Sequence, residues 1–130
     1  MPQQKIKILS ISKPSEINRI KASKKKFHAK SLILLKINSP AQYLEPHFPG
    51  HTNLYRSAYI VTKAVGNAVI RNKAKRRLRA CFLSLIKSGQ INASNDYLVI
   101  AKREIANCDY KNILSDLKFC STRIDKIIKS

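Results

Sequence analysis

Residues 66–85, GNAVIRNKAKRRLRACFLSL, combine an apolar stripe and a dense basic run in one stretch of helical period. The stripe recurs at three- and four-residue steps and consists of Ala74, Leu78, Cys81, Phe82 and Leu85. The residues broadly opposite it on a helix are Asn72, Lys75, Arg76 and Arg79, and those on its flank are Lys73 and Arg77. The stretch therefore predicts a helix that packs with one side and presents cations with the other.

One further helix is expected on each side of this stretch. Apolar residues recur at helical spacing in the C-terminal part, at Tyr110, Ile113, Leu114, Leu117, Cys120, Ile124 and Ile127. Asp109 stands near the start of that helix, where a negative charge suits the helix dipole. A short helix is expected after Pro14, with Ser15 as its cap and residues 17 and 20 on its apolar side.

Three segments have the composition of strands. They are Ser31–Ile37, Tyr55–Thr62 and Asp96–Ala101. Pro40–Asn53 carries three prolines and a glycine, so we expect a loop there and a hairpin that pairs the first two strands across it. The order of helix, two or three strands, helix, strand and helix predicts an α+β sandwich with helices packed on a small sheet.

The chain is expected to form one domain. Residues 1–14 are expected to form an extended, flexible N-terminal arm, and residues 15–128 a single folded unit. The hydrophobic fraction of 44% is ordinary for a globular protein and too high for a disordered basic tail.

The charge of the chain is strongly positive and regional. Lysine and arginine number 26 against seven acidic residues, for a net charge of +19. Residues 1–90 hold 19 basic residues and only two acids, whereas residues 91–130 hold seven basic and five acidic residues. No acid lies between Glu45 and Asp96. The excess indicates one surface that faces a polyanion.

A charge run can also be no more than a solvated helix face. Here six cations fall within nine residues, from Arg71 to Arg79, without the interspersed acids that usually form stabilising pairs on a helix. Arginine prevails at the centre, and its planar group can grip a phosphate with two hydrogen bonds or stack on a base. We therefore favour an RNA-binding face.

Other residue types indicate little chemistry. The three cysteines lack metal-binding spacing, and Cys81 and Cys120 are expected as small buried apolar residues. His47 and His51 lie in the proline-rich loop with no third ligand evident, so no metal site is predicted. No segment resembles a signal peptide or a membrane span.

The basic stretch resembles the signature of the bacterial ribonuclease P protein subunit. The matching residues are Gly66, Asn67, Ala68, Val69, Arg71, Asn72, Lys73, Lys75, Arg76 and Arg79. Residues 60–63 resemble the strand that enters this motif, and residues 96–102 resemble the family's Asp-led strand with a basic exit. The sequence departs from the family at Lys73, where arginine is usual, and in the first helix, where Ile17 and Lys21 replace two phenylalanines.

The resemblance implies a compact αβββαβα sandwich with a left-handed βαβ crossover, and two RNA surfaces. The expected contacts with the catalytic RNA are Lys63, Gly66, Asn67, Arg71, Asn72, Lys73, Lys75, Arg76, Arg77 and Arg79. The expected cleft for the 5′ leader of precursor tRNA comprises Ile17, Lys21, Phe27, Lys30 and Tyr59. Core packing is the alternative for Phe27 and Tyr59.

In this family the RNA performs the hydrolysis with bound Mg²⁺, so the resemblance implies a non-catalytic subunit of a ribonucleoprotein endoribonuclease. It implies no catalytic residue, no cofactor held by the protein, no membrane and no obligate protein partner. The lack of a signal peptide or membrane span predicts a cytoplasmic protein. A ribosomal or RNA-chaperone protein that binds structured RNA is the main alternative, because its composition would look the same. A protein-only nuclease is a further alternative, but the seven acids are scattered where two metals would need clustered carboxylates. A membrane-active cationic protein fits less well, because the apolar stripes are expected to face a sheet.

Overall fold

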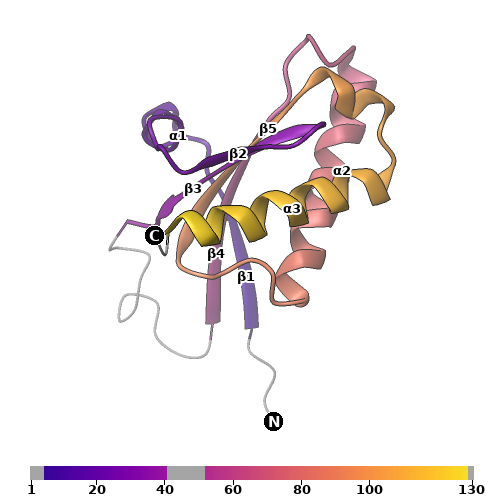
Figure 1. The fold of residues 1–130 in the computed structure, drawn as a ribbon. Coiled ribbons are helices and arrows are strands. Elements are labelled where there is room, and N and C mark those ends of the chain that lie inside the picture. Colours follow the sequence, from indigo (N-terminus) through magenta and orange to yellow (C-terminus); the bar gives the residue numbers. More distant parts are fainter. Residues whose placement is uncertain (1–4, 41–51, 129–130) are drawn as a thin grey trace.

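The computed structural model of this 130-residue chain describes residues 5–40 and 52–128. Five strands form one mixed sheet in the order β1-β4-β5-β3-β2, with helices packed around it (Figure 1). In chain order the elements are β1 (Lys5–Ser10), α1 (Pro14–Lys21), β2 (Lys26–His28), β3 (Leu32–Asn38), β4 (Thr52–Ile60), α2 (Ala68–Lys87), β5 (Asn95–Ala101), the 3-10 helix η2 (Arg103–Asn107) and α3 (Tyr110–Ile128).

The predicted α+β class is confirmed. From α1 to α3 the elements follow the expected αβββαβα order, and β1 precedes them. β4 and β5 are neighbouring parallel strands joined through α2, so a βαβ crossover is present. Its left-handedness stays a prediction. Most of the predicted loop, including His47 and His51, lies outside the described residues.

The hairpin expected between the strands at residues 31–37 and 55–62 is wrong. β5 lies between β3 and β4, antiparallel to the first and parallel to the second. Residues 96–99 of β5 are all buried, as suits a strand that is covered on both faces. The last strand of the chain therefore occupies the middle of the sheet.

The chain enters the sheet earlier than expected. Residues 5–10, which we assigned to an arm over residues 1–14, form an edge strand parallel to β4; residues 1–4 lie outside the described residues. α1 then begins at Pro14 with Lys13 as its N-cap, so the expectation that Ser15 is the cap is wrong. Proline suits the first helical position because its missing N–H needs no partner there.

The helices divide between the two faces of the sheet. α2 and α3 pack on one face, and α1 packs on the other (Figure 1). All five apolar positions predicted for residues 74–85 are buried. Of the apolar positions predicted in α3, Ile113, Leu117, Cys120 and Ile124 are buried, Leu114 is half-buried and Tyr110 is exposed. The side chain of Ile127 lies outside the described residues.

Ion pairs attach α1 to its face of the sheet. The buried Asp96 accepts hydrogen bonds through Oδ2 from Arg56 and Arg19, each at 2.9 Å, and through Oδ1 from Ser39 at 2.7 Å. Arg56 also donates to Glu16 of α1 at 2.8 Å. Burial raises the pKa of Asp96, while its hydrogen-bonded and charged partners oppose the rise. This network fixes the position of the short helix, which buries only Ile20 completely.

Candidate nucleic-acid interface

Gly66 and Asn67 build the turn that leads into α2. Gly66 has a φ of +156°, and a Cβ there would lie 3.0 Å from the side chain of Ile70. Asn67 is the N-cap, and its Oδ1 accepts a hydrogen bond from the backbone N–H of Ile70 at 3.0 Å. Direct contact of Gly66, Asn67 and the exposed Lys63 with RNA stays a prediction.

The outward side of α2 carries the predicted cations. We call Asn72, Lys75, Arg76 and Arg79 the basic face of α2; Lys75 is half-buried and the other three are exposed. Lys73 on the flank is also exposed. Val69, one turn before this face, is 76% exposed, so the N-terminal end of the helix offers apolar surface beside the cations. The helix thus packs and presents charge at once, as predicted.

No carboxylate neutralises this face within the described residues. The ion pairs found there join Arg19, Lys36 and Arg56 to acids elsewhere, and none involves a cation of α2. An exposed row of like charges without partners is unfavourable in isolation. The arrangement therefore suits a surface that meets phosphates, whose charge would relieve the repulsion.

Two arginines of the motif are turned partly inward. Arg77 is half-buried and donates from Nη1 to the carbonyl oxygen of Cys108 at 2.8 Å, which ties α2 to the start of α3. Arg71 is also half-buried, and its Nε is buried without a hydrogen-bond partner among the described residues. Arg77 thus has a structural role besides any contact with RNA, which its place on the flank did not indicate.

The structure does not bring the predicted leader-cleft residues together. Half-buried Ile17 and exposed Lys21 lie on α1. Phe27 packs on the opposite face of the sheet, edge-on to Phe119 of α3 with ring centroids 6.4 Å apart. Tyr59 packs on that same face, edge-on to the buried Phe82 at 6.3 Å. Both aromatics therefore pack against the core, and Tyr59 also lines a groove beside Arg79.

A row of isoleucines lies on the α1 face and was not predicted as part of the site. Ile33, Ile100 and Ile60 are directly opposite one another on β3, β5 and β4, and all three are half-buried. Exposed His28 of β2 continues the row, opposite Ile33. The three isoleucines and Ile17 belong to the smaller apolar cluster under α1. Only the strand register reveals this row, because its members come from four separate segments.

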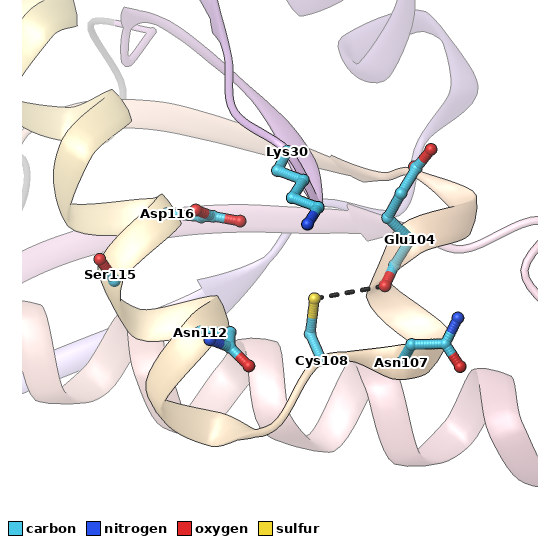
Figure 2. A pocket seen from close by; sticks show the side chains of 7 residues that line it. All are labelled: Lys30, Glu104, Asn107, Cys108, Asn112, Ser115 and Asp116. Atoms are coloured by element: carbon cyan, nitrogen blue, oxygen red, sulfur yellow. Dashed lines mark hydrogen bonds between the residues drawn. The ribbon is translucent and has the colours of Figure 1, made fainter.

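Lys30, the last predicted cleft residue, lines a different cavity of about 320 Å³ (Figure 2). Residues of η2 and α3 complete it: Glu104, Asn107, Cys108, Asn112, Ser115 and Asp116. Asp116 accepts hydrogen bonds from the backbone N–H and hydroxyl of Ser31, and the Cys108 thiol donates to the carbonyl oxygen of Glu104 at 3.2 Å. With two carboxylates to one ammonium group, this cavity has the wrong charge for phosphates.

The cysteines and acids provide no further site. Cys81 and Cys120 are buried, as predicted, and burial raises the pKa of each thiol to about 11. Within residues 5–40 and 52–128, no three His, Cys, Asp or Glu side chains gather as they would around a metal ion. No helix in this part of the chain has the length and apolar character needed to cross a membrane.

Sequence comparisons identify the family of this chain. A family model described as Ribonuclease P matches residues 7–125. The ribonuclease P protein component of Listeria monocytogenes serotype 4b is 39% identical over 66 residues, and this match spans about half of each protein, 51% of this chain and 54% of the relative. The corresponding protein of Paramagnetospirillum magneticum is 29% identical over 120 residues, which cover 92% of this chain and 85% of the relative.

Solved structures give the same fold. The RNase P protein of Staphylococcus aureus superposes with a TM-score of 0.68 at 24% identity, covering 95% of this chain and 97% of that one. The RNase P protein of Thermotoga maritima superposes with a TM-score of 0.65 at 20% identity, covering 83% and 90%. The sandwich of one five-stranded sheet and three helices is therefore that of these proteins.

Proposed function

The chain belongs to the Ribonuclease P protein family, and from this we propose that it is the protein subunit of ribonuclease P, which assists 5′ maturation of tRNA in the cytoplasm. The observation that carries the proposal is the basic face of α2, which no carboxylate neutralises within the described residues. Its partner in this proposal is the catalytic RNA.

Docking on that RNA depends on arginines that reach phosphates. Arg76 and Arg79 are exposed on the same side of α2 and three residues apart, so both can meet one RNA backbone. Each guanidinium group can bind a phosphate with two hydrogen bonds. Because every neutralised phosphate releases counterions, affinity should fall steeply as salt rises.

Chemistry is assigned to the RNA and its Mg²⁺ ions, and none to side chains of this chain. Four of the seven acids are engaged in ion pairs or hydrogen bonds within the fold. Glu16 and Asp96 pair with arginines, Asp125 pairs with Lys36 at 2.6 Å, and Asp116 bonds Ser31. These carboxylates come from separate elements and hold the fold together, which supports a non-catalytic role for the protein.

The single-stranded leader is proposed to lie on the α1 face. The isoleucine row there gives bases an apolar floor, and exposed Lys21 and Lys26 supply cations at its border. Such contacts do not depend on hydrogen bonds to particular bases, so the proposal implies that leaders of different sequence bind alike. A holoenzyme reconstituted with an Ile100→Ala variant should then have a lower affinity for precursor tRNA that carries the leader. Its affinity for mature tRNA should stay unchanged.

Reconstitution tests the proposed function directly. The full chain is mixed with a candidate bacterial ribonuclease P RNA and precursor tRNA at low Mg²⁺, and release of the leader is followed on a gel. Leader release that needs both components supports the proposal. Salt-dependent binding without stimulated release would favour another structured-RNA binder, and cleavage by protein and Mg²⁺ alone would favour a protein nuclease.

A further inference from the structure

A groove of about 290 Å³ lies between the edge strand β1 and α2, on the sheet face opposite α1. Its lining residues are Ile8, Ser10, Ser57, Tyr59, Arg79 and Leu83. This volume is at the lower end of the range for small-ligand sites. It suits a single planar chemical group better than an extended segment of peptide or nucleic acid. The two walls come from segments that lie far apart in the sequence, near the N-terminus and in the middle of the chain, so no local pattern marks this groove.

The groove joins the basic face of α2 without a break. Residues 72, 76, 79 and 83 follow one another at steps of four, three and four, so they form a single line along the helix. This line begins with an exposed amide, continues through two exposed arginines and ends at half-buried Leu83 inside the groove. An RNA backbone held by the arginines would pass the mouth of the groove.

The groove has the chemistry of a base-binding site. Its apolar walls are Ile8, which is 38% exposed, and Leu83. The guanidinium group of Arg79 lies over the ring of Tyr59, 5.7 Å from the centroid, so a flat cation and an aromatic ring stand together in the lining. Burial raises the pKa of Tyr59 to about 12, so its hydroxyl group is neutral at physiological pH.

We propose that this groove receives one unstacked nucleobase of the RNA that is bound along the basic face of α2. The inference rests on the proposed function, and it adds a site for a base to a surface otherwise described by its charge. Charge selects the occupant, because the arginines at the mouth attract a polyanion and repel basic segments. Stacking on a planar side chain accepts any base, so the site contributes affinity with little sequence preference.

Filling the groove tests the inference without a change of charge. Ile8→Trp places a large side chain in it, and Ile6→Trp is the matched control on the same strand and face, because Ile6 is 40% exposed but outside the lining. Loss of one stacked base should weaken binding of the catalytic RNA roughly tenfold in Ile8→Trp. The control should bind as wild type does, and the salt dependence of both variants should be unchanged because no phosphate contact is lost.

Arg79→Lys is the second variant, because it keeps the charge and loses the planar group. It should also weaken binding without changing the salt dependence. Chemical probing should show one unpaired nucleotide that wild type protects and Ile8→Trp leaves reactive.

Four results would overturn the inference. Equal losses in the two tryptophan variants, or wild-type affinity in Ile8→Trp while Arg76→Ala binds weakly, would remove the base site and leave the proposed function intact. A dimer that Ile8→Trp dissociates, with RNA affinity unchanged, would make the groove a contact between copies of this chain. A wild-type chain without salt-dependent RNA binding would remove the proposed function as well.

Discussion

Replacing Arg76 and Arg79 together with alanine should separate RNA binding from folding. Both side chains are exposed, and neither pairs with a carboxylate within the described residues. The fold loses only the contact of Arg79 with the Tyr59 ring, worth about 0.5–1 kcal/mol at an exposed site, and alanine regains part of this as the better helix former. Thermal unfolding should therefore change little.

Binding to the catalytic RNA should change much more. Each arginine that bonds a phosphate contributes roughly 1–2 kcal/mol, so the double variant should bind about 30- to 1,000-fold more weakly at physiological salt. Loss of two phosphate contacts should also lower the slope of log affinity against log salt by about 1.4 to 1.8. Fluorescence anisotropy of labelled RNA at three salt concentrations measures both quantities.

A matched control removes the same net charge elsewhere. Lys111→Ala with Lys118→Ala takes two exposed cations from α3. If only total charge mattered, the two double variants would lose affinity equally. Equal losses, or wild-type affinity in the Arg76 and Arg79 double variant, would refute the assignment of the basic face of α2 as the docking surface.

Three further predictions concern the fold. Gly66→Ala should lower the free energy of unfolding by about 1–2 kcal/mol, measured by urea denaturation, because the backbone there has positive φ and the new Cβ crowds the next turn. Arg56→Met should cost about 3 kcal/mol or more in the same measurement, because it leaves the buried carboxylate of Asp96 with less compensation. The free energy of unfolding should begin to fall as pH rises above 9 and continue to fall to about 11, because the raised thiol pKa values of Cys81 and Cys120 stabilise the folded state only while both groups are protonated. Replacing both cysteines with alanine should reduce the slope between pH 9 and 10, below the range in which Tyr59, whose pKa burial also raises, contributes. An unchanged slope there would contradict this cause.

The comparisons with relatives cover the sequence unevenly. The match to the Listeria protein reaches 39% identity over only half of this chain, whereas the match to the Paramagnetospirillum protein is weaker in identity and covers 92% of it. In the first helix, Ile17 and Lys21 replace the expected phenylalanines. The isoleucine row on the sheet face under α1 provides an apolar surface there, although these phenylalanines are absent.

The amino-acid sequence by itself determined the long helices, the central strand and the basic face of α2. Each of these depends on local spacing. Apolar residues at helical steps must face a core, and the cations on the opposite side of the helix must then face outward, whatever the helix packs against. The buried positions from Ala74 to Leu85 and the exposed Arg76 and Arg79 follow from that rule.

Only the tertiary structure decided how the strands pair and which side chains share a face. A strand alternates its side chains between two faces, so a face is assigned only when the register with its neighbours is known. That register put Phe27 and Tyr59 against α3 and α2, and it aligned isoleucines from three distant strands beneath α1. It also placed β1 beside α2 and so formed the groove around Arg79. Strand pairing is a contact between distant segments, and hydrophobic pattern alone does not choose the partner.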